Sequence, residues 1–130
     1  MAQHDVELIL ARQLAEYLGL AVFIIDPAGN MIFYNEPAEG LLGKRFEEDG
    51  EMPAMVWATV FNPVDDDGRP LGPEAMPLLM ALSEGHPVHR GFWIRGLDQV
   101  RRRIEVTAIP LVGIAGHALG AMAIFWEGGS

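Results

Sequence analysis

One run near the start of the chain, residues 22–43 (VFIIDPAGNMIFYNEPAEGLLG), constrains the fold more than any other part of the sequence. Residues 20–26 form a predicted apolar strand, and Met31–Tyr34 form a second one. The residues between them, 27–30, suit a tight turn, because proline presets φ and glycine or asparagine tolerates positive φ. The run therefore predicts a β-hairpin whose strands are almost continuously apolar.

The hairpin leads directly into a predicted short helix. Asn35 ends the second strand, and its side chain can cap a helix over Glu36–Leu42, which Gly43 ends. Asp26 closes the first strand, where its carboxylate can accept hydrogen bonds from the backbone of the turn. We interpret both Asp26 and Asn35 as structural residues.

One helix and three strands are predicted in the second half of the chain. The helix spans Pro77–Glu84, with proline in its first turn and Gly85 as its C-terminal cap. The strands cover Val88–Arg95 and residues 102–109 and 118–126. Two strands, a helical crossover and three further strands predict an α+β architecture, an antiparallel sheet with helices on one face.

Alternation along the strands assigns their faces. In the strand over residues 102–109, three residues point inward and three outward: Ile104, Val106 and Ala108 against Arg103, Glu105 and Thr107. In the preceding strand, Phe92 and Ile94 share the inward face and Trp93 takes the other. The two hairpin strands do not alternate. A strand that is apolar on both sides is buried on both faces, so a second layer must cover the sheet there.

The remaining segments are a helix before the sheet and a loose connection within it. Apolar residues recur at three- and four-residue spacing over residues 4–18, which predicts an amphipathic helix. Residues 44–68 contain two acidic turns and one predicted short helix around Trp57. The expected boundaries are an N-terminal amphipathic helix over residues 1–19, one domain over residues 20–127 and a tail over residues 128–130.

The order and spacing of these pieces resemble the PAS domain, the small sensory fold of signalling proteins. The hairpin and its helix resemble the opening of that domain, and residues 76–85 resemble its central helix with a Pro-Leu start and an Ala-Leu…Gly end. Residues 102–111 and 116–124 resemble its last two strands. The resemblance covers about residues 20–126. It implies a PAS-like five-stranded antiparallel sheet with helices on one face and an N-terminal flanking helix, in a bacterial-type module for sensing and protein interaction in signal transduction.

Composition limits the location and the partners. The chain of 130 residues contains no cysteine, which excludes disulfides and thiolate chemistry. No stretch approaches the ~18 apolar residues of a membrane span, and no basic and then apolar leader opens the sequence. We therefore expect a cytoplasmic protein that does not bind membranes. The net charge of −9 argues against nucleic acid as a partner, because phosphate binding requires a basic surface.

No sequence pattern for catalysis is present. The chain lacks a glycine-rich phosphate loop, an HExxH pattern and a GxSxG pattern. The carboxylates gather on turns rather than around a histidine or lysine, and the triplet over residues 65–67 lacks the alternation of a calcium loop. We predict a non-catalytic module without a metal site.

The resemblance raises the question of haem and flavin. Members of the family that carry haem supply the iron ligand from the central helix or nearby, and His86 and His89 follow that helix. We interpret both as partly exposed surface residues, since a haem histidine needs a buried apolar pocket. The light-sensing flavin members need a cysteine in an NCRFLQ-type stretch, which this chain lacks. We predict no cofactor, with haem or non-covalent flavin as the alternative.

A small-molecule sensor is the alternative to a dimerising regulatory module with a small or empty core. Seven methionines fit either reading, because methionine is a flexible filler of cores and of adaptable pockets. If a ligand binds, it is expected between the central helix and the last three strands. The residues expected to line this pocket share inward parity or helical spacing: Met76, Leu79, Met80, Phe92, Ile94, Ile104, Val106 and Met122 or Ile124.

The sequence predicts more apolar surface than one isolated sheet can cover. Large exposed apolar patches are rare on monomers, so we expect an isologous homodimer, the commonest form of soluble oligomer. The expected contact combines the outer face of the sheet with Val6, Ile9, Leu10, Leu14, Tyr17 and Trp93. The competing arrangement is a monomer whose N-terminal helix folds back on its own sheet.

Overall fold

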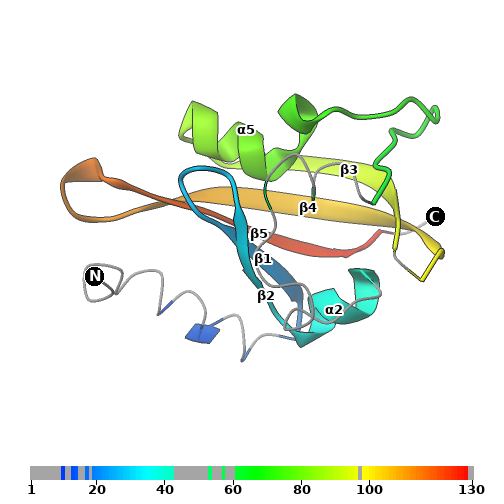
Figure 1. Cartoon of the computed structure of the whole chain (residues 1–130), viewed down its shortest axis with the longest axis horizontal. Helices are drawn as coiled ribbons and strands as arrows, with labels where there is room; N and C mark the ends of the chain where they lie inside the picture. Colours follow the sequence, from blue (N-terminus) through cyan, green and yellow to red (C-terminus); the bar gives the residue numbers. More distant parts are fainter. Residues whose placement is uncertain are drawn as a thin grey trace.

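A five-stranded antiparallel sheet organises the computed structural model, which describes residues 19–42, 61–96 and 98–128 and the single residues 10, 13, 14, 17, 53 and 57. The strands lie in the order β2-β1-β5-β4-β3 (Figure 1). Their bounds are β1 Ala21–Ile25, β2 Met31–Tyr34, β3 Val88–Arg95, β4 Arg101–Val112 and β5 Ala118–Glu127. The predicted fold class is confirmed, and β4 is longer than the strand expected over residues 102–109.

The hairpin of β1 and β2 has the predicted turn. The Asp26 carboxylate accepts hydrogen bonds from the backbone N–H groups of Ala28 (3.0 Å) and Asn30 (2.9 Å). Gly29 has φ of 92°, a left-handed conformation that glycine adopts without steric cost. Asp26 therefore has the structural role expected of it.

Asn35 does more than cap the helix that follows, α2 (Glu36–Leu42). Its Oδ1 accepts hydrogen bonds from the N–H of Ala38 in α2 (3.2 Å) and from the N–H of Val22 in β1 (3.0 Å). Its Nδ2 donates to the carbonyl of Leu20 (2.9 Å). One side chain, only 4% exposed, thus joins β1 to the start of α2.

The helix α5 (Pro77–Glu84) lies across one face of the sheet, which we call the inner face (Figure 1). It follows a short 3-10 helix over Pro73–Ala75 and buries Pro77, Leu78 and Ala81. Gly85 ends it with φ of 76°, and the N–H of Gly85 donates to the carbonyl of Ala81. The predicted bounds and cap of this helix are confirmed.

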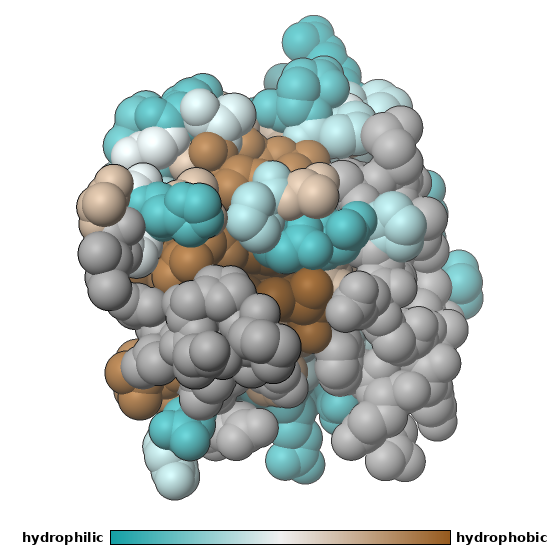
Figure 2. All heavy atoms as spheres, turned by 60° about the vertical axis from the view of Figure 1, so that its left-hand side comes forward, coloured by the Kyte–Doolittle hydropathy of each residue, from teal (hydrophilic) through white to brown (hydrophobic). Residues whose placement is uncertain are grey.

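Strand alternation distributes the side chains of β3 and β4 as predicted. Phe92, Ile94, Ile104, Val106 and Ala108 are buried in the core of the inner face. The predicted outward residues of β4 lie on the opposite, outer face, where Arg103 and Glu105 bind each other. On the side of the molecule that carries the β4–β5 loop, hydrophobic atoms reach the surface and hydrophilic atoms lie across them (Figure 2).

A second, smaller core occupies the outer face near β1. Val22 and Ile24 are completely buried there, together with Phe33 and Met122. The five residues of β1 are all buried, so the expectation that this strand is covered on both faces is confirmed. The apolar interior therefore has two layers, one on each side of the sheet.

The N-terminal flanking helix is only partly within the described residues. Leu10, Gln13, Leu14 and Tyr17 have helical backbone, whereas Val6 and Ile9 lie outside the described residues. The short helix expected around Trp57 also lies mostly outside them. Among the helices that the structure describes, none combines the length and the apolar composition needed to cross a membrane.

Candidate functional site

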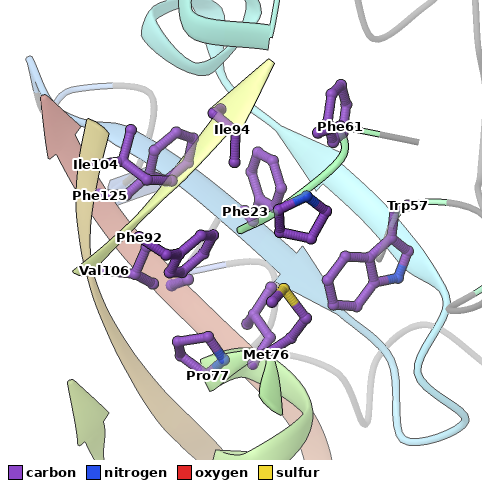
Figure 3. A pocket seen from close by; sticks show the side chains of 13 residues that line it. Phe23, Trp57, Phe61, Met76, Pro77, Phe92, Ile94, Ile104, Val106 and Phe125 are labelled. Carbon is purple, nitrogen blue, oxygen red and sulfur yellow. The ribbon is translucent and has the colours of Figure 1, made fainter. Parts of the chain in front are cut away.

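An apolar cavity of about 50 Å³ lies between the inner face of the sheet and the segments that cover it. We call it the inner cavity. Its walls come from four strands, from α5 and from the chain that precedes α5 (Figure 3). The lining consists of Phe23, Trp57, Phe61, Pro63, Met76, Pro77, Leu78, Phe92, Ile94, Ile104, Val106, Ala123 and Phe125.

Strand pairing builds the sheet side of the inner cavity. Phe92 of β3 pairs with Ile104 of β4, and Val106 of β4 pairs with Phe125 of β5. Partners directly opposite on neighbouring strands place their side chains on the same face, so these four side chains converge. Ala123 of β5 contributes only a methyl group, which leaves space that a larger residue would fill.

Trp57 and Met76 lie across the cavity from the sheet (Figure 3). The indole N–H of Trp57 donates to the carbonyl of Gly29 at 2.9 Å, so the hairpin turn satisfies its polar atom. Met76 precedes α5 with extended backbone, and its unbranched thioether side chain can change rotamer readily. The wall opposite the sheet is therefore apolar and adaptable.

The lining restricts the chemistry of the cavity. All thirteen side chains are apolar apart from the indole N–H, so the lining has no group for acid–base or nucleophilic catalysis. Affinity would come from apolar burial, at about 25 cal/mol per Å². The volume is smaller than the roughly 150 Å³ of an engineered cavity that binds benzene. In this conformation the cavity admits a small apolar group.

Five of the nine predicted pocket residues line the cavity: Met76, Phe92, Ile94, Ile104 and Val106. Leu79 and Met80 are not among the lining residues. Both are half-buried, because α5 directs Pro77, Leu78 and Ala81 toward the sheet instead.

The inward orientation expected of Met122 and Ile124 is wrong. Both lie in the core of the outer face, and β5 presents Ala121, Ala123 and Phe125 to the inner face. The physical reason is that β5 is a central strand with apolar residues on both faces, so alternation gives no sign of which face is which. On the inner face, β5 instead presents the small side chains of Ala121 and Ala123.

Neither His86 nor His89 is positioned to bind a haem iron in the inner cavity. The side chain of His86 is 61% exposed, and its Nε2 lies 3.0 Å from Glu84. His89 lies on the outer face, with Nε2 3.0 Å from Glu105 and Nδ1 2.8 Å from the Thr107 hydroxyl. The cavity lining contains no histidine, so the residues present do not fit haem there.

A flavin also does not fit the lining. Cofactor-sized ligands occupy pockets of roughly 300–1,000 Å³ that offer a few well-placed polar groups. The inner cavity has about 50 Å³, and its one polar side-chain atom is already bonded to Gly29. The described part of the chain contains no cluster of three or more histidine, aspartate or glutamate side chains that could hold a metal ion.

The outer face of β3 and β4 carries a chain of polar contacts, which we call the outer-face network. Arg103 binds Asp66 through two nitrogens, at 2.9 and 3.1 Å, and also binds Glu105. Glu105 in turn contacts His89, which contacts Thr107. The hydrogen bonds from Arg103 are the main cause that lowers the pKa of Asp66 and the pKa of Glu105 below their usual values.

Trp93, one of the expected dimer contacts, is held by this same region. Its indole N–H donates to Asp66 at 3.0 Å, and the guanidinium of Arg101 lies 5.0 Å from its ring centroid. Part of its outward surface is therefore already used by contacts within the chain. Trp93 does lie on the face opposite to Phe92 and Ile94, as predicted.

One segment, residues 61–71, connects the inner cavity with the outer-face network. Phe61 and Pro63 line the cavity, and Asp66 binds Arg103 on the other face. Val64 exchanges two backbone hydrogen bonds with Trp93 (2.8 and 3.0 Å), and the carbonyl of Phe61 accepts one from Arg95 (2.7 Å). The segment therefore pairs with the free edge of β3.

Solved structures with the same arrangement are PAS and LOV domains. The PAS domain of a protein from Colwellia psychrerythraea has a TM-score of 0.66 and 18% identity, covering 92% of this chain and 95% of that one. The PAS domain of BvgS from Bordetella pertussis has a TM-score of 0.65 and 14% identity, covering 95% of this chain and 87% of that one. The LOV protein of Rhodobacter sphaeroides has a TM-score of 0.68 and 15% identity, covering 95% of this chain and 68% of that one.

At these identities the likeness establishes the fold: the chain has the PAS fold, as its sequence resemblance implies. No protein-family model matches the sequence, and no curated protein matches it.

Proposed function

We propose that this chain is a non-catalytic, bacterial-type PAS module for sensing and protein interaction in signal transduction, with the inner cavity as its sensing site. The observation that carries the proposal is a wholly apolar cavity between α5 and the sheet of a PAS fold. The similar structures are PAS and LOV domains by name, and the lining has no catalytic group. A cytoplasmic location belongs to the same proposal and is consistent with the absence of cysteine.

The test is native mass spectrometry of the protein purified from cells, with an absorption spectrum of the same sample. We expect a small colourless molecule bound to the chain. It should be lost in Ala123→Leu, which fills the cavity, and kept in Ala118→Leu, a matched substitution at the exposed start of β5. A Soret or flavin band would contradict the cofactor-free proposal. A bare chain that also shows no thermal shift with 1-hexanol would contradict the sensing site.

The second part of the proposal is that the module dimerises. Leu10, Leu14 and Tyr17 have helical backbone and are 56%, 53% and 87% exposed. Their spacing of four and three residues puts them on one side of a helix. The outer face at β1 is already buried within one chain, so the proposed contact follows this exposed stripe and Leu20, which is 44% exposed. A second copy of the chain would bury the stripe.

Sedimentation of the intact chain tests the dimer. We expect twice the chain mass, and we expect Leu14→Glu and Tyr17→Glu to weaken association because each buries a charge in the contact. Val112→Glu, at an exposed apolar residue at the far end of β4, is the control and should leave association unchanged. A single species near 14.3 kDa at high concentration would rule out the dimer.

A further inference from the structure

Among the five arginines of β3 and β4, only Arg90 has no partner in the described part of the chain. The other four bind as follows: Arg95 to Gln99, Arg101 over Trp93, Arg102 to Asp98, and Arg103 to Asp66 and Glu105. For Arg90 the described residues provide no hydrogen bond and no ion pair. An arginine normally engages a carboxylate or phosphate when it is drawn out of water.

The lack of a partner for Arg90 matters because of where this residue lies. Its Cα pairs with that of Val106, which lines the inner cavity, and partners opposite on neighbouring strands share a face. Phe92, which is two residues further along β3 and therefore on the same face, also lines the cavity. Arg90 is half-buried and lies on the inner face, beside the cavity and at the edge strand of the sheet.

The neighbouring helix offers no counter-ion. The only acidic residue of α5 is Glu84, and its carboxylate lies 3.0 Å from the imidazole of His86. Arg90 is thus a half-buried arginine beside an apolar cavity, and no carboxylate of the described residues engages its donors, so they are available to a bound molecule.

We propose that the inner cavity takes an apolar monocarboxylate, whose tail fills the cavity and whose carboxylate binds Arg90. This inference rests on the proposed sensing role of the cavity. A single negative charge matches the single arginine, whereas a dianion would meet the repulsion of a chain with net charge −9. The volume of about 50 Å³ favours a short aliphatic tail over a fused ring system.

The test compares sodium hexanoate with 1-hexanol, two probes of equal chain length that differ in charge. Binding to the full chain is measured by calorimetry at pH 7 and constant ionic strength. In the unmodified protein we expect hexanoate to bind about tenfold more tightly, the value of one charge-assisted contact in partly wet surroundings. Arg90→Gln should abolish this preference, and Arg90→Lys should restore part of it.

The control is Arg95→Gln, at the exposed end of the same strand, which should keep the preference. Equal affinity for the two probes in the unmodified protein, or a preference that survives Arg90→Gln, would overturn the role of Arg90 and leave the cavity as a binding site. Binding of neither probe would overturn the sensing site itself. Circular dichroism of each variant verifies that it folds.

Discussion

The two sides of the sheet differ in what they place on the outer face. We call β1 and β2 the β1 end, and β4 and β3 the β4 end. At β1, Val22 and Ile24 are completely buried on that face. At β4, the same face carries Arg103 and Glu105, whose side chains are 21% and 26% exposed. On the inner face, both β1 and β4 contribute buried apolar side chains to one core. One end of the sheet is therefore a strand buried between two apolar layers, and the other separates an apolar cavity from a charged surface.

The charged end is connected to the cavity by residues 61–71. Residues 61–71 place Phe61 against the cavity and Asp66 against Arg103, only five residues apart. Because the segment is hydrogen-bonded to the edge of β3, we expect a ligand that displaces the Phe61 wall to change the Asp66–Arg103 contact. We therefore expect the β4 end, rather than the doubly covered strand β1, to respond to a ligand in the cavity.

The largest expected effect distinguishes two strand glycines, one packed against β1 and one in β3. Gly120 of β5 has φ of 134°, and a Cβ there would lie 2.0 Å from the carbonyl oxygen of Ile25 in β1. Gly120→Ala should lower the free energy of unfolding by more than about 4 kcal/mol or prevent folding. A Cβ on Gly91 of β3 would meet only the ends of the Arg103 and Glu105 side chains, which can move. Gly91→Ala should cost about 1 kcal/mol or less by urea denaturation.

The second prediction compares the two faces of β4. Ile104 is 4% exposed on the inner face, and Ile104→Ala should cost about 2–5 kcal/mol through lost burial and a cavity. Thr107, on the outer face, contacts His89 at the surface, and Thr107→Ala should cost less than about 1 kcal/mol. Urea denaturation of both variants measures the two losses in the free energy of unfolding, which can then be compared. Similar losses would mean that the outer face of β4 is as tightly packed as the inner one.

Asn35 gives a test within the β1 end. Asn35→Ala removes the helix cap and leaves the N–H of Val22 and the carbonyl of Leu20 without this partner. The expected loss is about 2–3 kcal/mol, above the ~1 kcal/mol of a cap alone. Asn30→Ala is the control, because Asn30 bonds to Asp26 in the turn and spans no two elements. Equal losses would show that Asn35 acts only as a local cap.

The smallest effect is expected from Asp66→Asn in the outer-face network. The pKa of Asp66 is lowered mainly by the hydrogen bonds from Arg103, so its charged form stabilises the fold at neutral pH. This contribution should be lost as the pH falls below about 4, through the lowered pKa of the folded state. The stability difference between Asp66→Asn and the unmodified chain should therefore shrink in acid and at high salt. A difference that stays constant from pH 7 to pH 3 would contradict the assignment.

Local patterns were enough to predict most of the elements. The bounds of β2, β3, α2 and α5 follow from turn residues, caps and apolar runs, all of which act within a few residues. The inward residues of β4 also followed from alternation, because its outer face is polar. Four of the cavity residues on β3 and β4 were accessible in this way: Phe92, Ile94, Ile104 and Val106.

Long-range contacts account for what could not be predicted. Trp57 enters the cavity wall because its indole reaches Gly29, 28 residues away in the sequence. Asn35 reads as a cap, and its bonds to Val22 and Leu20 depend on the packing of α2 beside β1. The face of β5 could not be assigned because both of its faces are apolar, and the place of Met122 on the outer side follows only from the pairing with β1.

The most direct test of the sensing site is a methyl NMR titration of the full chain with 1-hexanol, because the two apolar layers carry different reporters. The methyl groups of Met76, Ile94 and Ile104 report on the inner cavity, and those of Ile24, Met122 and Ile124 report on the outer core. We expect saturable shifts confined to the first group. Shifts in the second group alone, or none in either, would contradict the assignment of the inner cavity as the site where this protein binds its signal.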